Sequence, residues 1–162
     1  MMKRIFSMLF VISLFCLISV PAVASSGLED PVVAEALKFF EEAPQNRGVP
    51  FATVDGDQPR IRYLTFLFVR DGKIWFLTSD GKKVGQQLMK NPKAAFVGMP
   101  SGLKQIRVEG SGGVSKDPEV MEAAAKIYRG VKADDPTALL FYIDKGTVTI
   151  WERGKPTQEI EF

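Results

Sequence analysis

The chain has 162 residues, with 21 basic and 19 acidic side chains, one cysteine and no histidine. A chain without histidine lacks the commonest metal ligand and the commonest general base at neutral pH. A Ser-His-Asp triad, a histidine zinc site and a histidine-ligated haem within this chain are therefore excluded.

The first 24 residues have the pattern of a secretory signal peptide. Lys3 and Arg4 precede an apolar run at 5–20 that is short for a membrane span, and the Ala-Val-Ala sequence at 22–24 is a small-x-small cleavage site. We expect cleavage after this site and export to the periplasm or the exterior, with no membrane association afterwards. Retention of the segment as an N-terminal anchor is the alternative.

Cleavage changes both the charge and the redox chemistry of the chain. It removes two of the 21 basic residues and leaves 19 against 19 acidic ones, so the mature chain has no global electrostatic attraction for nucleic acid or an anionic membrane. It also removes Cys16, and with it any disulfide, thiolate metal site or cysteine nucleophile. Residues 25–162 have a length that suits one domain with a hydrophobic core.

The first part of the mature chain predicts one helix and three strands. Asp30-Pro31 is a helix start with proline at the first helical position. The apolar face of this helix consists of Val32, Val33, Ala36, Leu37 and Phe40. The helix ends near 43–44, and a loop at 46–48 leads to a strand at 49–54 and a turn at 55–57. Strands at 60–69 and 73–79 follow around a turn at 70–72, with Trp75 in the core.

The second part predicts two helices and the remaining strands. A short helix at 83–91 is stopped by Pro92, and strands at 94–99 and 104–114 flank a turn at 100–102. A longer helix begins at Asp117-Pro118. Its apolar face consists of Val120, Met121, Ala124, Ile127 and Tyr128. Strands at 138–143 and 147–151 flank a turn at 144–146, and an alternating tail ends at Phe162. Six or seven strands in hairpins favour a small closed barrel or an α+β roll.

Three short stretches carry residues that could bind a ligand. The first is the corner after the strand at 73–79, where Thr78 and Ser79 are followed by an Asp-Gly turn and then by Lys82 and Lys83. Hydroxyls, paired ammonium groups and a helix N-terminus together suit a phosphate. The alternative is an exposed corner in which Thr78 and Ser79 only cap the helix.

The other two stretches lie on strands. Arg60 and Arg62 are two residues apart and therefore project from one strand face, either as a phosphate clamp or as a solvated face. Gln105, Arg107 and Glu109 alternate with apolar residues, which is typical of the wet face of an antiparallel sheet. Gln105 could equally bind the edge of a planar heterocycle, because its amide both donates and accepts.

Turn and loop geometry explains the remaining acidic residues. Asp55, Asp57 and Asp71 lie in turns, and Asp134 and Asp135 precede a proline in a loop without further oxygen ligands at calcium spacing. We therefore predict no metal site.

Taken in order, the stretches PRIRYLTF, IWFLTSDGKK and QIRVEG resemble the pyridoxamine 5′-phosphate oxidase-like family of FMN-binding split barrels, over residues 49–119. The resemblance implies a mainly β fold with flanking helices, namely a six-stranded antiparallel split β-barrel. It also implies a homodimer with FMN in each of two clefts between the subunits.

The resemblance implies roles for the first two stretches. Arg62, Tyr63 and Leu64 match the family's strand that runs along the flavin, with Arg62 near the phosphate or the polar edge of the ring. Thr78 and Ser79 match the strand end that contacts the ring and the ribityl chain.

Lys82 and Lys83 match the family's basic pair on the phosphate, and Gln105 matches a glutamine that hydrogen-bonds the flavin. The turn before the basic pair is one residue shorter than in the true oxidases, and Gly81 stands where a phosphate-binding serine is expected. Those oxidases also carry a C-terminal arginine–histidine pair that holds the vitamin substrate, which this chain lacks. We therefore expect a family member other than the vitamin B6 oxidase.

The leading hypothesis is an exported FMN-binding protein that acts as a flavin-dependent oxidoreductase on an unknown substrate. The second hypothesis is a non-enzymatic binding module that uses the same dimer cleft for flavin or another phosphorylated heterocycle. The third is a structural dimer whose cleft has lost its ligand, in which case Lys82 and Lys83 are merely solvated.

Overall fold

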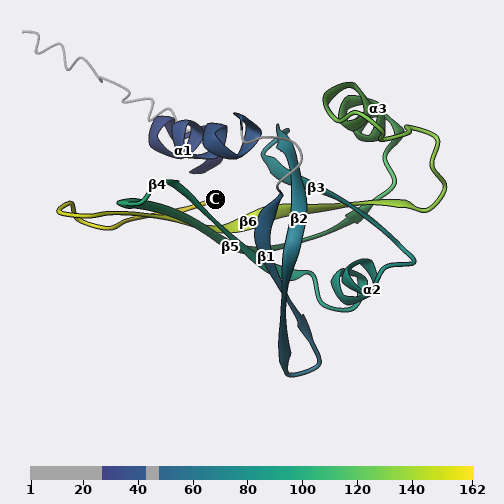
Figure 1. Ribbon diagram of the computed structural model, residues 1–162, viewed down its shortest axis with the longest axis horizontal. Coiled ribbons are helices and arrows are strands. Elements are labelled where there is room, and N and C mark those ends of the chain that lie inside the picture. The colour runs from purple at the N-terminus through teal and green to yellow at the C-terminus, as the bar shows by residue number, and fades with distance from the viewer. Residues whose placement is uncertain (1–26, 43–47) are drawn as a thin grey trace, which may run out of the picture.

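The computed structural model describes residues 27–42 and 48–162, so the expected signal peptide at 1–24 and the residues before Gly48 in the expected loop lie outside it. In chain order the elements are η1 (Gly27–Glu29), α1 (Pro31–Glu42), β1 (Val49–Asp55), β2 (Gln58–Arg70), β3 (Lys73–Ser79), α2 (Lys83–Lys90), β4 (Lys93–Ser101), β5 (Lys104–Ser115), α3 (Pro118–Ile127), β6 (Ala138–Glu152) and β7 (Gln158–Glu161) (Figure 1). Within the described ranges, no helix is long and apolar enough to cross a membrane.

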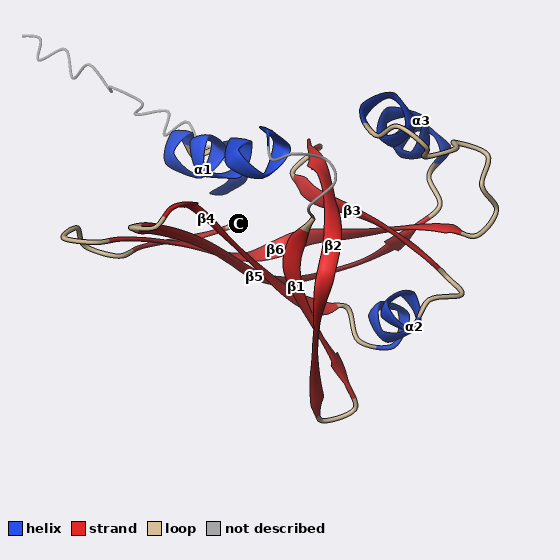
Figure 2. Ribbon diagram, viewed as in Figure 1, coloured by secondary structure: helices blue, strands red, loops and turns tan. Residues whose placement is uncertain are grey.

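Six of the strands form a closed antiparallel ring. The order is β3-β2-β1-β4-β5-β6, and a further pairing between β3 and β6 closes it, while β7 lies beside the second half of β6 (Figure 2). Closure removes the unpaired edges that an open sheet exposes. The predicted six-stranded antiparallel split barrel with flanking helices is confirmed.

The predicted turn at 144–146 is wrong, because β6 runs through it as one strand. Strand β5 pairs with β6 on both sides of the expected turn. Asp144 of β6 is an extra residue opposite Ser111 and Gly112, and this bulge bends β6. At the bend Gly146 faces Gly110, and a Cβ on Gly146 would stand 2.1 Å from the Glu109 carbonyl oxygen. Gly146 is therefore required because the two strands lie very close together at this point, and it does not form a turn that reverses the chain. The bend lets β6 pair with β3 before it and with β7 after it.

The interior of the ring is filled by aromatic side chains. The ring centroids of Phe51 and Phe76 are 4.9 Å apart, those of Phe76 and Phe96 are 5.0 Å apart, and Phe141 lies 6.1 Å from Phe51. Edge-to-face packing at these separations is the favourable arrangement for buried rings. Helix α1 covers this core through Phe40, whose ring centroid is 5.1 Å from that of Phe96.

The apolar faces predicted for the two long helices are largely confirmed. In α1 all but the exposed Val32 are buried, and in α3 all but the exposed Ile127 are buried. Helix α3 packs on the outside of β3 and β6, where its Met121 belongs to the same buried cluster as Trp75. Trp75 is therefore a core residue, as predicted.

Candidate functional site

Strands β2 and β3 separate at one end, and α2 lies there. Their pairing begins at Thr65 opposite Leu77, so Arg62 on β2 and Thr78 on β3 lie beyond the paired part of the two strands. Helix α2 follows β3 directly and packs against both β1 and β3 (Figure 1). The helix thus connects the end of β3 to the outer portion of the β1–β2 hairpin.

A glycine allows α2 to approach β3 this closely. A Cβ on Gly85 would lie 2.3 Å from the carbonyl oxygen of Ser79 and 3.3 Å from a methyl group of Leu139. On either side of Gly85, Val84 and Leu88 are buried in the main core. Any larger residue at position 85 would push the helix away from the strand end.

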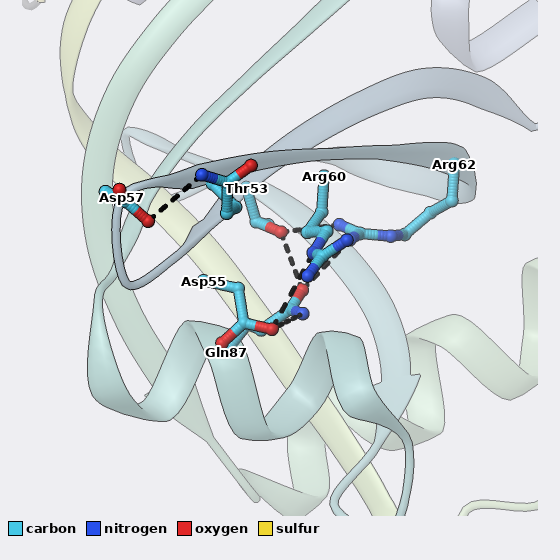
Figure 3. A network of polar contacts seen from close by, with 7 residues as sticks. Thr53, Asp55, Asp57, Arg60, Arg62 and Gln87 are labelled. Carbon is cyan, nitrogen blue, oxygen red and sulfur yellow. Dashed lines mark hydrogen bonds and ion pairs between the residues drawn. The ribbon is translucent and has the colours of Figure 1, made fainter.

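A hydrogen-bond network joins α2 to the hairpin (Figure 3). The Arg62 guanidinium donates from Nη1 to Thr53 Oγ1 over 2.6 Å and from Nη2 to Gln87 Oε1 over 2.9 Å. The Thr53 hydroxyl donates to the same Gln87 oxygen over 2.9 Å. Gln87 Nε2 donates to Asp55 Oδ2 over 3.2 Å, and that oxygen lies 3.7 Å from Arg60 Nε. Arg60 and Arg62 therefore do share one side of β2, as the spacing predicts.

The Arg62 charge has no carboxylate in contact with it among the described residues, because its acceptors are a hydroxyl and an amide. Burial lowers the pKa of Arg62 below its ordinary value, and the nearby Arg60 cation lowers it further. Both effects mean that the charged form pays a desolvation and repulsion penalty. A bound anion would stabilise the charged form and offset both effects, since a charge-assisted hydrogen bond to guanidinium is strong.

The N-terminus of α2 is also open and basic. Lys82 occupies the N-cap position without a side-chain cap, and the first turn contains no acidic residue. Lys82 and Lys83 are exposed and form no ion pair within the described residues. The one acidic residue of the preceding turn, Asp80, is paired with Lys116 Nζ at 2.9 Å. The alternative in which Thr78 and Ser79 cap this helix is therefore wrong.

Thr78 has a buried hydroxyl oxygen without a hydrogen-bond partner in the described chain. Leaving such a group unsatisfied costs about 1–3 kcal/mol, which is why nearly all buried polar atoms are paired. Its neighbour Ser79 is only partly buried at the strand end. The unpartnered Thr78 hydroxyl fits a site where a ligand supplies the missing partner.

Two of the sequence-predicted residues lie on the opposite face of the barrel wall. Tyr63 is 72% exposed, whereas Arg62 and Leu64 on either side of it point the other way. Gln105 is partly buried on β5 opposite Trp151 of β6, on the same polar face as Arg107. Strands β1 and β4 stand between Gln105 and Arg62, so one chain does not bring these two side chains together. The predicted wet face of β5 is confirmed.

A groove of about 750 Å³ lies on the wall formed by β1, β4, β5 and β6. Ala52, Ala95, Glu109 and Thr147 stand side by side across these four strands and line it. Thr53 also lines the groove, but its hydroxyl contacts Arg62 and Gln87 on the face of β1 opposite to Ala52, so the groove and the Arg62 network lie on opposite sides of this strand.

Thr53, Asp55 and Gln87 belong to the network around Arg62 but are not among the residues predicted from the sequence. A signal for Gln87 exists in the sequence, because it is a polar residue at helical spacing from Val84 and Leu88 on the buried face of α2. Asp55 was assigned to a turn alone, whereas its side chain also accepts from Gln87. In the described ranges, no group of three or more His, Cys, Asp or Glu side chains could hold a metal ion.

The family model described as pyridoxamine 5′-phosphate oxidase matches residues 34–151, which is most of the chain. The chain belongs to the pyridoxamine 5′-phosphate oxidase family. A pyridoxine/pyridoxamine 5′-phosphate oxidase from Pseudomonas putida (strain W619) is 35% identical over 79 residues, which are 48% of this chain and 37% of that enzyme. This chain therefore matches little more than a third of that relative's length.

Two solved structures are similar over most of their length. A NimC/NimA family protein from Clostridium acetobutylicum has 29% identity and a TM-score of 0.69, with 80% of this chain and 91% of that chain covered. A pyridoxamine 5′-phosphate oxidase-related, FMN binding protein from Nostoc punctiforme has 18% identity and a TM-score of 0.61, covering 84% and 90%.

The fold does not fix the ligand. A heme binding protein from Mycobacterium smegmatis shares the fold, with 16% sequence identity and a TM-score of 0.53 over 76% of this chain and 56% of that chain. An F420 reductase also shares the fold, with 16% sequence identity and a TM-score of 0.50 over 61% of this chain and 86% of that chain.

Proposed function

We propose that this chain is an exported, homodimeric FMN-binding protein that acts as a flavin-dependent oxidoreductase. The observation that carries the proposal is the Arg62 guanidinium, which is partly buried and held by two uncharged acceptors while its charge lacks a carboxylate in the described chain. A phosphate monoester is the anion that suits such a preorganised planar donor.

The residues around α2 would hold the phosphate end of FMN. Arg62, Lys82 and Lys83 together offer three positive charges to a dianion, and the uncapped first-turn amides of α2 add donors. Thr78 and Ser79 would contact the ring and the ribityl chain, which gives the buried Thr78 hydroxyl a partner. The bound flavin would supply the redox chemistry, and the protein would bind and orient it.

The homodimer explains why the candidate residues lie on two faces. Gln105 and Tyr63 stand on the outer wall, away from the Arg62 network of the same chain. Ile61 on the same wall is 80% exposed and Trp151 is also exposed, which favours burial against a partner. In a dimer, the outer wall of one subunit would meet the α2 corner of the other, and Gln105 would reach the flavin from there.

A non-enzymatic binding module for flavin or another phosphorylated heterocycle is the second candidate. It rests on the same phosphate-binding residues, together with the presence of this fold in proteins that bind heme or act on F420. If the ligand is FMN, the two candidates differ only in whether the bound flavin is turned over.

The test begins with expression of the full chain and mass spectrometry of the purified protein, which reads the N-terminus and hence the expected cleavage after Ala24. FMN is then titrated and followed by its visible spectrum and fluorescence. We expect binding with a dissociation constant in the micromolar range or below, and a mass of two chains by light scattering. No measurable FMN binding would overturn the proposal.

The double variant Lys82→Ala/Lys83→Ala should weaken FMN binding about 100-fold, because two charge-assisted contacts are lost. A matched control, Lys126→Ala/Lys132→Ala, removes the same charge from the α3 side and should leave binding unchanged. Bleaching of the bound flavin by a nicotinamide donor, with turnover in the presence of an acceptor, would favour the oxidoreductase over the binding module.

A further inference from the structure

We propose that Gln87, oriented by Asp55, is a positioning residue that sets Arg62 for a phosphate and makes the site discriminate between phosphorylated and unphosphorylated flavin. The inference rests on the proposed function. It concerns a glutamine that sits with its side chain buried between α2 and the β1–β2 hairpin and that holds three polar partners (Figure 3).

The orientation of the Gln87 amide is set by Asp55. A carboxylate only accepts hydrogen bonds, so the amide group of Gln87 must direct its NH₂ to Asp55 and its oxygen to the other side. That oxygen then faces Arg62 Nη2 at 2.9 Å. Asp55 and Arg62 thus favour the same orientation, because the reversed one would place an NH₂ against a guanidinium and an oxygen against a carboxylate. Without Asp55 the amide would lose its second anchor.

Thr53 completes the support of Arg62. Its hydroxyl accepts from Arg62 Nη1 and donates its own proton to Gln87 Oε1. Both terminal nitrogens of the guanidinium are thereby fixed by acceptors from two different elements. Two of its five N–H groups are used in this way, and the other three remain for a ligand in a fixed plane. Such preorganisation reduces the entropy lost when a phosphate binds.

The two side chains that contact Arg62, Thr53 and Gln87, are uncharged. The negative charge of Asp55 lies behind Gln87 and does not contact Arg62. Asp55 lies near Arg60 rather than Arg62, so the carboxylate and Arg60 offset each other while the charge of Arg62 stays available. A carboxylate at position 87 would instead pair with Arg62 and compete with a phosphate. The choice of glutamine therefore favours anion binding over a tighter internal ion pair.

Burial shows that Gln87 is not an incidental surface contact. The residue is 6% exposed and Thr53 is 2% exposed, and Gln87 stands between the core residues Val84 and Leu88 on α2. An apolar residue could fill this position without the need for buried hydrogen-bond partners. The buried amide is explained by what it does to Arg62.

The experiment compares dissociation constants for FMN and riboflavin, which differ only in the phosphate. In the wild-type protein we expect FMN to bind at least 100-fold more tightly than riboflavin. Gln87→Glu keeps the shape and neutralises Arg62, and should reduce this preference about 50-fold. Gln87→Leu removes the support and should reduce it about tenfold. Riboflavin affinity should stay within about threefold in both variants. The matched control is Gln86→Glu, which adds the same charge at the exposed neighbour without contacting Arg62, and which should reduce the preference much less than Gln87→Glu does.

Asp55→Ala separates positioning from simple charge. Removing a negative charge near an anion site should strengthen FMN binding if charge alone matters, whereas loss of the amide orientation should reduce the FMN preference several-fold. A rise in the preference would overturn the role of Asp55.

The outcomes distinguish the two proposals. A wild-type preference for FMN that survives in both Gln87 variants would overturn this inference and leave the proposed function standing. Equal losses of FMN and riboflavin affinity together with a lower melting temperature would show that Gln87 is merely structural. A wild-type protein that binds neither flavin would remove the proposed function and the inference together.

Discussion

Helices α2 and α3 both pack against the barrel wall, but they do so with opposite chemistry. Helix α3 buries Met121 and Ala124 against Trp75, in a cluster made of apolar and aromatic side chains. Helix α2 buries Gln87 beside Val84, and this amide meets a threonine, an arginine and an aspartate. Of two short helices packed against one barrel, α3 thus makes an apolar contact and α2 encloses a polar network.

The contrast between the two helices identifies buried residues that the stability of the fold does not explain. The buried polar side chains of the described ranges are Thr53, Thr78, Gln87 and Thr149. The first three lie at the α2 corner, and one of them is the unpartnered Thr78. Buried polar groups cost free energy unless they are fully satisfied, so their concentration at one helix is consistent with the ligand site proposed there.

The same contrast between a polar and an apolar contact is seen in the pKa values of Arg62, beside α2, and Tyr128, at the end of α3. Burial lowers the pKa of Arg62 and raises that of Tyr128 to about 12, because in both cases it disfavours the charged form. At neutral pH Tyr128 is uncharged and avoids this penalty, whereas Arg62 is charged and bears it. Of these two groups, Arg62 is therefore the one that a bound anion would stabilise.

The largest expected effect is on the α3 side. Met121→Ala deletes a buried side chain from an apolar cluster and should lower the free energy of unfolding by about 2–4 kcal/mol. Because α3 lies apart from the polar network, the ratio of FMN to riboflavin affinity should stay at the wild-type value. Chemical denaturation and flavin titration measure the two quantities, with the exposed Glu122→Ala as control. A changed affinity ratio would show that the two helices are not independent.

The next effect is on the docking of α2. Gly85→Ala places a methyl group 2.3 Å from the Ser79 carbonyl oxygen, so the helix must shift, at a cost of about 1–3 kcal/mol. In contrast to Met121→Ala, this change should also reduce FMN binding, since Gln87 and Lys83 move with the helix. Gly81→Ala is the matched control, because its Cβ would meet only the Ser79 hydroxyl oxygen at 3.9 Å. Equal stability of the two variants would contradict the close approach of α2.

Much of the fold followed from local patterns. The strand β3 has the predicted bounds, and the turn before it was identified from its Asp-Gly pair, whose φ angles of 52° at Asp71 and 66° at Gly72 need residues tolerant of positive φ. The Asp-Lys-Gly sequence at 144–146 has similar composition but lies inside β6. The difference arises from β5, which continues alongside β6, and a partner strand is invisible in a local pattern.

The site was predicted less completely, for a physical reason. Arg62, Thr78 and the two lysines were identified from residue type and spacing, but Gln87 meets Arg62 from 25 residues away and Asp55 from 32 residues away. Such contacts depend on how α2 docks in the gap between β2 and β3. Strand alternation predicts that Tyr63 faces away from Arg62. Which of the two faces becomes the outer wall depends on the direction in which the barrel closes, and sequence spacing does not contain that information.

A pH dependence should separate the two helices again, with a smaller effect. The pKa of Tyr128 is raised from its ordinary value near 10 to about 12 by burial and by Glu41. The unfolded chain loses this proton near pH 10 while the folded protein keeps it, so the stabilisation is complete below pH 10 and is lost progressively between pH 10 and 12. Tyr128→Phe should show a shallower loss of unfolding free energy in this window. The exposed Tyr63→Phe serves as control, and parallel curves for wild type and Tyr128→Phe would contradict the prediction.

The smallest expected effect is a gain at the α2 corner. Gly81 occupies the position where the family's serine is expected, its backbone has no positive φ, and space around it is open. Gly81→Ser should therefore fit without strain and add a hydroxyl donor near the basic pair, strengthening FMN binding about three- to tenfold with riboflavin binding unchanged. Gly102→Ser, in another open turn, is the control. Replacing this glycine can stabilise the fold to a similar extent, but it should leave FMN affinity unchanged. If Gly81→Ser leaves FMN affinity unchanged, the phosphate does not lie at this turn, and Arg62 and Lys83 would have to bind it from the hairpin side of α2.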